Sequence, residues 1–419
     1  MSALWTGDEL RGRFEALSAF LQEHRALWWP APFLDEPTDW PERWPEVAAW
    51  IAALRDDEIE AYEANPGEMP GPPALRAWIA KAEALGALGA WPEAPLPSPP
   101  LGRWEEHHQV KARKWAQIER FAAAVWPGLP DQGPLVDWCA GKAHLGRTLR
   151  RHGGPPVRAL EWNATLATDG AALATAQGVD GLDFCVADAT SAAAAEVLQN
   201  ATGAVALHAC GQLTDRLLAG AAGARLPWVA VAPCCYWRLG AVTAHAPRSR
   251  AAQARDLGLD LSRLHLACNE EVTGSPRLYA ERRRNLAWRL GLDALLREGA
   301  GQDARVPLPG GIRALLPLPF ADFCAQAARH LALPLPARWD PAAAEQEGWR
   351  RMRAVRARGL VRAPFRRLLE LWLALDRALY LLESGYTVSM GTFCAPQLTP
   401  RNVLIVATQA PPSAAGALR

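Results

Sequence analysis

Between residues 135 and 232, short apolar runs alternate with stretches of helical pattern, and no other feature of the chain constrains its fold as strongly. Such runs are typical of strands buried on both faces of a parallel sheet, with helices between consecutive strands. We expect strands at 135–138, 157–161, 182–187, 204–208 and 228–232, and helices at 115–125, 145–151 and 164–177. The sequence therefore predicts an α/β fold of Rossmann-like type.

The segments on either side of this core have a different texture. Residues 1–100 mix short helical patterns with tryptophan and proline and end in a proline-rich stretch, which predicts a helical extension. After Tyr236 the regularity is lost for over a hundred residues, until Pro364 opens an apolar helix that Gly385 ends. Two last strands are expected at 386–393 and 403–407. The predicted segments are an extension at 1–100, a core at 101–240, a basic insertion at 241–362 and a closing part at 363–419.

Composition narrows the class of protein. Half of the 419 residues are hydrophobic, and 45 basic residues nearly balance 44 acidic ones, as in a soluble globular enzyme. The start of the chain lacks a signal-peptide pattern, and no run approaches twenty apolar residues, so we expect a cytoplasmic protein with no membrane partner. The eight cysteines contain no CxxC pair, which argues against a disulfide scaffold and a zinc ribbon, and we predict no metal.

Acidic residues end three successive expected strands. Asp137 enters a loop that continues through Gly141 to Gly146 at the start of a helix, where backbone N–H groups can face a cofactor. Glu161 follows Gly141 by twenty residues, where a carboxylate would accept hydrogen bonds from ribose hydroxyls, and Asp188 is placed to bond an adenine amino group. The loop alone could be an ordinary strand-to-helix turn, and each acid alone could be a helix cap.

Several segments together resemble one methyltransferase family. The resemblance rests on residues 112–119, 137–144, 206–211 and 232–236, and on Leu375-Asp376-Arg377 and Leu398-Thr399-Pro400-Arg401-Asn402. The family includes the methyltransferase domain of glutathione S-transferase C-terminal domain-containing protein and, more distantly, eukaryotic tRNA 2'-O-methyltransferases. The resemblance implies a class I fold with a seven-stranded, mostly parallel sheet, an insertion between strands five and six, and S-adenosylmethionine as cofactor.

The expected cofactor site follows from the loop, the acids and this resemblance. Lys142 is singled out because lysine is rare in an arginine-biased chain, and we expect it to meet the cofactor carboxylate. The cofactor-binding candidates are Asp137, Cys139, Gly141, Lys142, His144, Gly146, Glu161, Asp188, Ala189 and His208.

The methyl acceptor is expected at the ends of the fourth and fifth strands. His208 could remove a proton from the acceptor, Tyr236 could stack on a base, and Cys234 or Cys235 could attack a pyrimidine ring. The cysteines could equally be small buried residues, or hold zinc with His208 and Cys210, although their spacing fits no common ligand pattern. The catalytic candidates are His208, Cys234, Cys235 and Tyr236, and the substrate-binding candidates are Arg377, Arg401 and Asn402.

An arginine run at 350–367 and a cluster at 282–284 favour RNA, ribosomal or transfer, as the acceptor. The run could also be a solvated helix face in an arginine-rich protein. Protein and small-molecule acceptors stay open, as does a non-catalytic protein of the same fold that binds the cofactor or RNA. A nicotinamide dehydrogenase is disfavoured, because the closing strands and the Pro-Cys-Cys-Tyr segment have no role in that chemistry.

Overall fold

The computed structural model describes residues 3–34, 38–98, 110–268, 276–301 and 308–409. The chain forms two compact units. The first, the sheet unit, comprises Met1–Glu23, Ala84–Asn269 and Arg366–Arg419, and the second, the helical unit, comprises His24–Glu83 and Glu270–Phe365.

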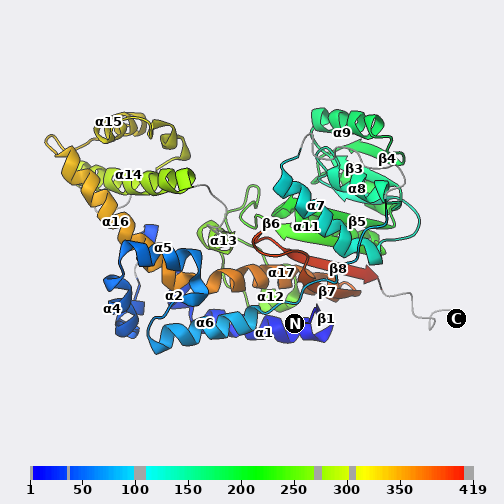
Figure 1. Ribbon diagram of the computed structural model, residues 1–419, viewed down its shortest axis with the longest axis horizontal. Helices are drawn as coiled ribbons and strands as arrows, with labels where there is room; N and C mark the ends of the chain where they lie inside the picture. The colour runs from blue at the N-terminus through cyan, green and yellow to red at the C-terminus, as the bar shows by residue number, and fades with distance from the viewer. Residues whose placement is uncertain (1–2, 35–37, 99–109, 269–275, 302–307, 410–419) are drawn as a thin grey trace. The chain divides into compact units, whose positions relative to one another are not determined.

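The sheet unit is built on one eight-stranded sheet (Figure 1). Its strands are β1 (Trp5–Thr6), β2 (Leu135–Trp138), β3 (Val157–Glu161), β4 (Leu182–Val186), β5 (Gly203–Cys210), β6 (Trp228–Cys234), β7 (Tyr386–Thr392) and β8 (Val403–Gln409). They lie in the order β1-β7-β8-β6-β5-β2-β3-β4. Neighbours from β6 to β4 run parallel, whereas β8 is antiparallel to both β6 and β7. The predicted Rossmann-like α/β class is confirmed.

The predicted strand count of seven was wrong by one. The extra strand, β1, is antiparallel to β7, with Trp5 opposite Met390 and Thr6 opposite Ser389. Farther along the same edge of β7, Gly89 and Trp91 exchange backbone hydrogen bonds with Thr392. Two short segments from the first hundred residues therefore cover the outer edge of β7. A two-residue strand is too short to show the alternation that predicted the other seven.

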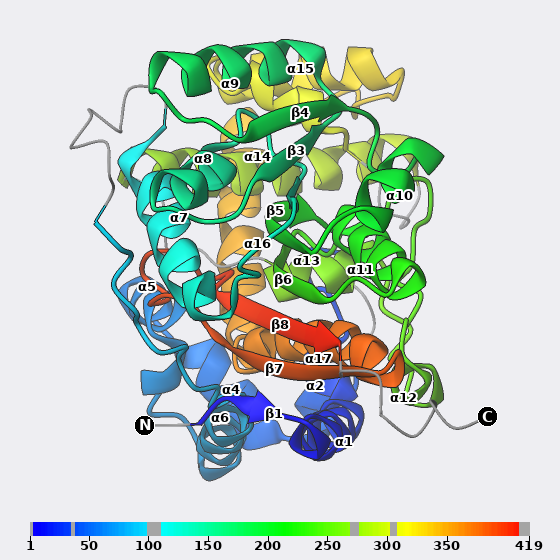
Figure 2. The same ribbon diagram turned by 90° about the vertical axis from the view of Figure 1, so that its right-hand side faces the viewer.

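Helices cover both faces of the sheet. Figure 2 shows α8 and α9 with α7 on one face, and α10 and α11 on the other. The helices of the sheet unit are α1 (Asp8–Glu23), α7 (Ala112–Val125), α8 (His144–Arg151), α9 (Ala164–Ala176), α10 (Ala192–Gln199), α11 (Gln212–Ala224), α12 (Arg250–Ala254), α13 (Leu261–Cys268) and α17 (Phe365–Glu383), whose first residue belongs to the helical unit. A short 3-10 turn, Trp126–Gly128, follows α7.

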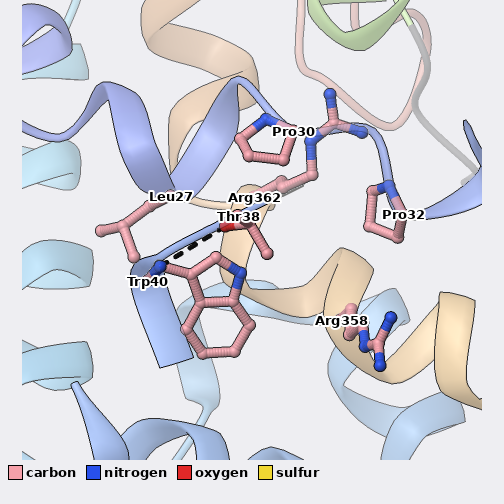
Figure 3. Close-up of a pocket in the computed structure, with 7 residues that line it drawn as sticks. All are labelled: Leu27, Pro30, Pro32, Thr38, Trp40, Arg358 and Arg362. Carbon is pink, nitrogen blue, oxygen red and sulfur yellow. Dashed lines mark hydrogen bonds between the residues drawn. The ribbon is translucent and has the colours of Figure 1, made fainter. Parts of the chain in front are cut away.

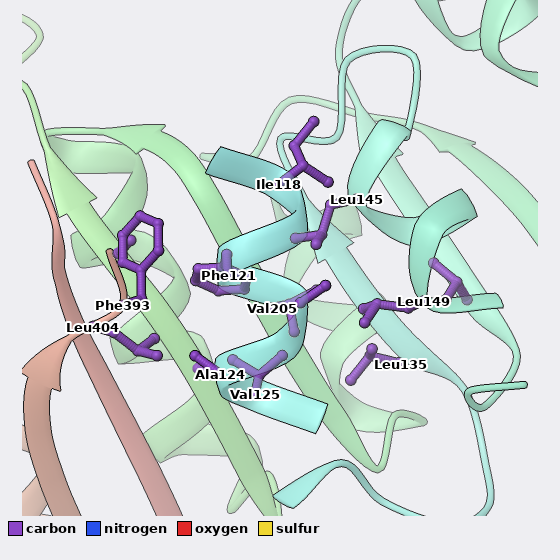
Figure 4. Close-up of a cluster of buried hydrophobic side chains, with 14 of the residues drawn as sticks. Ile118, Phe121, Ala124, Val125, Leu135, Leu145, Leu149, Val205, Phe393 and Leu404 are labelled. Atoms are coloured by element: carbon purple, nitrogen blue, oxygen red, sulfur yellow. The ribbon is translucent and has the colours of Figure 1, made fainter. Parts of the chain in front are cut away.

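The core of the sheet unit forms where α7 packs on the strands (Figure 4). Phe121, fully buried on α7, contacts Phe393 edge to face with ring centroids 5.6 Å apart. Every residue of β2 and β6 is buried, as expected for central parallel strands, whereas β4 at the sheet edge is only partly covered. Burying a large apolar side chain stabilises the fold by about 1.5–3 kcal/mol, so this packing fixes the strand ends that form the candidate site.

The helical unit has its own core, which contains Trp288, Phe320 and Phe323. Its helices are α2 (Arg25–Trp28), α3 (Trp40–Arg43), α4 (Pro45–Ala53), α5 (Asp56–Ala64), α14 (Pro276–Ala300), α15 (Phe320–Leu331) and α16 (Pro341–Arg362), with 3-10 turns at Pro32–Leu34, Pro66–Glu68 and Gly310–Leu315. Helix α6 (Pro73–Gly86) crosses the boundary between the units. No helix within the described ranges is long and apolar enough to cross a membrane.

The predicted segments 1–100 and 241–362 do not coincide with these units. Each contributes to both, because 24–83 packs with the later helices while 241–268 packs beside the sheet. The lost regularity after Tyr236 also has an explanation, since α14 and α16 are long helices rich in arginine. Their buried sides contain ion pairs, which a search for apolar periodicity does not register.

Candidate active site

The order of the strands determines where a ligand can bind. From β2 the chain moves outward through β3 to β4 and then returns to β5 on the other side of β2. In open parallel sheets, ligands bind beyond the carboxyl ends of the strands where the direction of winding reverses. The loops after β2 and β5 therefore flank the candidate site.

The loop after β2 is tightly folded. Cys139, Gly141 and Ala143 all have left-handed backbone conformations, with φ of 59°, 59° and 52°. The Gly146 amide donates to Asp137 Oδ2 at 2.9 Å, and a Cβ on Gly146 would lie only 2.8 Å from Val157 Cγ1. Glycine is thus required at 146 for the close approach of α8 to the strands. Cys139 and Ala143 adopt left-handed conformations although they are not glycines, which carries a steric cost.

Asp137, predicted to contact the cofactor, supports the loop after β2. Its side chain is buried and supports the loop from inside through Gly146. Burial raises the pKa of the Asp137 carboxyl to about 7, although the Gly146 hydrogen bond opposes this rise. Asp137 therefore positions the loop, and its predicted contact with the cofactor stays a prediction.

Glu161, at the end of β3, holds two backbone segments together. Its Oε2 accepts from the Gly141 amide at 2.8 Å and its Oε1 accepts from the Asn163 amide at 2.9 Å. Each carboxylate oxygen can accept a further hydrogen bond. Glu161 thus links the loop after β2 to the start of α9 and still has capacity to bind hydroxyl groups.

The remaining predicted cofactor residues differ in their surroundings. Lys142 forms an ion pair with Asp169 on α9, with 2.9 Å between Nζ and Oδ2, so the structure gives it a partner within the protein. Burial lowers the pKa of His144 to about 4, with the charge of Arg147 adding to the effect. Asp188 is exposed and accepts from the amide and hydroxyl of Thr190, and the partly buried Ala189 follows it.

Two apolar side chains at this end of the sheet were missed by the sequence analysis. Trp162, directly after Glu161, is 74% exposed, and Val186, at the end of β4, is 54% exposed. Large apolar side chains that stay exposed beside a ligand crevice are candidates for ligand contact. The position of Trp162 directly after an acidic strand end was the available signal.

At the end of β5, His208 lies in a left-handed conformation with φ of 74° and remains exposed. The protein around the ring displaces part of its hydration, which lowers the pKa of His208 to about 4, and the positive charge of Lys114 contributes. Gly211 has φ of 55°, and a Cβ there would meet the Arg238 carbonyl oxygen at 2.2 Å. The turn that presents His208 thus depends on glycine at 211.

Three thiols meet beside His208. Cys210 Sγ and Cys234 Sγ are 3.6 Å apart, and both lie within 4.8 Å of Cys235 Sγ. Cys234 is buried, whereas Cys210 and Cys235 are partly exposed. Hydrogen bonds from the two neighbouring thiols lower the pKa of Cys235 to about 3, and the charges of Arg238 and Arg401 act in the same direction. Of the two cysteines proposed as nucleophiles, only Cys235 combines accessibility with thiolate character.

Tyr236, predicted to stack on a base, has a side chain that is only 1% exposed. The Arg377 guanidinium covers the Tyr236 ring at 4.9 Å from the centroid and forms a 2.9 Å ion pair with Asp215. Arg377, predicted to bind substrate, is itself fully buried. Its neighbour Asp376 accepts hydrogen bonds from the Arg248 and Ser249 amides, the Ser249 hydroxyl and His245.

Arg401 and Asn402 likewise hold the protein together. Arg401 pairs with the buried Glu370 at 3.4 Å and donates to the Cys268 carbonyl. Asn402 is 3% exposed, donates to the Cys394 carbonyl at 2.8 Å and accepts from Arg367 at 3.0 Å. These contacts give Asn402, a predicted substrate-binding residue, a role in holding the loop before β8.

Most of the arginine run at 350–367 is paired within the protein. In the helical unit, Arg353 donates to Asp56 at 2.6 Å and Arg356 to Glu63 at 2.9 Å. From the second basic cluster, Arg283 pairs with Glu60 at 2.6 Å. All three acids belong to α5, so this acidic helix is the counterpart of the run. The expected tracking of phosphates by these arginines is not supported by their surroundings.

The helical unit contains a hollow of its own (Figure 3). Its lining residues are Leu27, Pro30, Pro32, Thr38, Trp40, Arg358 and Arg362. Arg362 Nε donates to the Trp28 carbonyl at 2.9 Å. None of the described residues that line it carries a thiol, imidazole or carboxylate, so the strand ends of the sheet unit remain the candidate for catalysis.

Comparison with known families agrees with this assignment. Residues 113–242 match the family described as a methyltransferase domain. This part of the chain is thus similar to a methyltransferase domain. The match confirms the predicted enzyme class and S-adenosylmethionine as its methyl donor, while the substrate is a separate question.

Solved structures to which the chain is similar include M. jannaschii TYW2 in complex with AdoMet, with 14% identity, coverage of 30% of this chain and 53% of that chain, and a TM-score of 0.25. An rRNA methylase from Streptococcus thermophilus is 13% identical, with coverage of 29% of this chain and 71% of that chain and a TM-score of 0.23. Coclaurine N-methyltransferase bound to N-methylheliamine and SAH is 12% identical, with coverage of 54% of this chain and 59% of that chain and a TM-score of 0.25. The chain thus spans about half the length of the TYW2 protein.

Proposed function

We propose that the sheet unit transfers a methyl group from S-adenosylmethionine to RNA at the carboxyl ends of β2, β3, β5 and β6. The observation that carries this proposal is the arrangement at the winding reversal, where the loop ordered by Glu161 and the exposed His208 follow adjacent strands. Adjacent placement of a cofactor loop and a proton acceptor suits transfer from one bound molecule to another.

The cofactor would lie across the ends of β2, β3 and β4. Glu161 has unused acceptor capacity for the ribose hydroxyls, and the exposed Trp162 and Val186 offer apolar surface to the adenine ring. Hydrogen bonds from Thr190 lower the pKa of the exposed Asp188, so its carboxylate is ionised. It can accept a hydrogen bond from the adenine amino group. The bound cofactor supplies an electrophilic methyl group on a sulfonium.

The acceptor would lie at the ends of β5 and β6. His208 is exposed there, and its ring can take a proton from an attacking hydroxyl or amino group as the new bond to the methyl group forms. A covalent route through Cys235 remains an alternative within the same site. Undiminished methyl transfer by Cys235→Ser would eliminate that route.

Exposed cations at this end of the sheet unit support RNA as the acceptor. Lys114 acts electrostatically on Asp137, His144 and His208, so its side chain lies close to the strand ends. Lys111, Lys114 and Arg238 are exposed, and none has a carboxylate partner within the described part of the chain. Such unpaired cations can contact phosphates. The resemblance to tRNA methyltransferases points in the same direction.

Binding and transfer are tested separately. By calorimetry we expect wild-type protein to bind S-adenosylmethionine and Glu161→Ala to bind it at least about tenfold more weakly, with Glu281→Ala in the helical unit as the matched control. Absence of binding by the wild type would refute the cofactor assignment.

The acceptor is identified with the labelled methyl donor and cell extract from a strain that lacks the gene. We expect label in RNA and a loss of rate of about 100-fold or more in His208→Gln, with His330→Gln as control. Label confined to protein or to small molecules would refute RNA while leaving methyl transfer intact.

A further inference from the structure

The three thiols at the ends of β5 and β6 form a group whose purpose methyl transfer does not explain. Cys210 ends β5, Cys234 ends β6 and Cys235 follows it, so adjacent strands bring together residues far apart in sequence. All three Sγ atoms lie within 4.8 Å of one another. The thiols therefore occupy one small volume at the accessible edge of the sheet.

The distances match the geometry of a thiolate metal site. Zinc binds cysteine sulfur at about 2.3 Å in a tetrahedral arrangement, which places two sulfur ligands about 3.8 Å apart. Cys210 Sγ and Cys234 Sγ are 3.6 Å apart. We propose that Cys210, Cys234 and Cys235 bind one zinc ion, with the fourth position open to water or another ligand.

The backbone holds these thiols in place. Cys210 and Cys234 are direct partners across β5 and β6, and the Gly211 amide donates to the Cys234 carbonyl at 2.9 Å. The pairing shifts between Leu207 and Cys210, and Cys235 turns out of β6 with φ of 46°. Such irregularities re-aim side chains at strand ends, and here they direct three sulfurs toward one point.

The charge around the cluster suits a bound zinc ion. Three thiolates and one Zn²⁺ carry a net charge of about −1, and the positive charges of Arg238 and Arg401 act on Cys235. The Arg238 amide also donates to the Cys235 carbonyl at 2.9 Å, which keeps this arginine at the cluster. On binding, the ion replaces the thiol protons, which are released to solvent.

Exposure favours an open fourth position. Cys234 lies underneath, whereas Cys210 and Cys235 are partly exposed, so an ion held by all three has one accessible side. Sites with three protein ligands and one exchangeable ligand are typical of catalytic rather than structural zinc. The proposed ligands come from the ends of two strands, and their spacing in the sequence therefore resembles no common zinc pattern.

The test measures metal directly and needs no methyl transfer. Full-length protein is purified under reducing conditions, stripped with a chelator and titrated with Zn²⁺ against a competing chromophore. We expect one zinc per chain, and each of Cys210→Ser, Cys234→Ser and Cys235→Ser to weaken affinity by more than about 100-fold, beyond the 10–100-fold cost of losing a supporting residue. Cys185→Ser and Cys394→Ser should retain wild-type affinity, and His208→Ala should lose less than about tenfold.

Cobalt supplies a second measurement. Co²⁺ bound in place of zinc should give thiolate charge-transfer absorption that disappears in the three serine variants but not in the two controls. Failure of the wild type to bind either ion would overturn the proposal. A Cys210–Cys234 disulfide that persists in the purified protein, detected by intact mass with and without reductant, would also overturn it in favour of a redox pair.

Discussion

The two units use their charged side chains in different ways. In the helical unit, the acidic helix α5 pairs Asp56, Glu60 and Glu63 with arginines of α14 and α16. In the sheet unit, the ion pair between Arg377 and Asp215 is buried, whereas the exposed Lys114 and Arg238 lie at the strand ends. The difference shows that clustered arginines indicate nucleic-acid binding only after their partners within the protein are known.

The strongest test of this contrast removes a buried cation. Arg377→Met should lower the free energy of unfolding by about 3–5 kcal/mol, because Asp215 would remain buried without its main partner. The measurement is urea denaturation followed by far-ultraviolet circular dichroism. A loss below about 1 kcal/mol, the range of surface pairs, would show that Arg248 alone satisfies Asp215.

The pH dependence of stability should also differ between the units. The pKa of Asp137 is raised to about 7, so between about pH 4 and 7 the folded state holds a proton that the unfolded state has lost. Stability from this group is present at low pH and declines as pH rises through that window, by up to about 1.4 kcal/mol per pH unit. Asp137→Asn should flatten this part of the profile.

Glu60 in the helical unit should behave in the opposite way. Its hydrogen bond from Arg283 lowers its pKa, so its contribution is present at neutral pH and is lost as pH falls through the folded pKa. Glu60→Gln should therefore alter only the acidic end of the profile. If Asp137→Asn and Glu60→Gln changed the pH dependence of stability in the same way, the expected difference between the two units would be contradicted.

The salt dependence of RNA affinity should differ between variants of the sheet unit and of the helical unit. Lys114→Ala and Arg238→Ala should each weaken affinity and reduce the dependence of log affinity on log salt by about 1. Arg353→Ala should leave that slope unchanged, because Asp56 already pairs with Arg353. A reduced slope in Arg353→Ala would instead assign phosphate contacts to the helical unit.

The smallest effect is expected at the surface of the helical unit. Arg350 and Glu347 pair at 2.6 Å, but their side chains are 69% and 38% exposed. Arg350→Ala should change the free energy of unfolding by less than about 1 kcal/mol. A larger loss of unfolding free energy in the same denaturation measurement would mean that exposed ion pairs also stabilise the helical unit.

Sequence patterns predicted the positions of strands and helices, because these depend on the local order of apolar residues. Seven strands and helices such as α8 and α9 were located to within a few residues, because their apolar residues recur at the period of the element. Patterns could not reveal the pairing of Arg356 with Glu63 or the meeting of Cys210 with Cys234, since both depend on tertiary contacts. For the same reason the motifs did not indicate that Tyr236, Arg377 and Asn402 are buried.

The cover over β7 has a practical consequence for handling the protein. Residues 5–7 and 89–91 occupy backbone groups of β7 that would otherwise be open to pairing with another chain. A truncation that removes residues 1–7, or a rigid fusion placed against Trp5, would expose this edge as a template for self-association. Affinity tags are therefore better placed at the opposite end of the polypeptide.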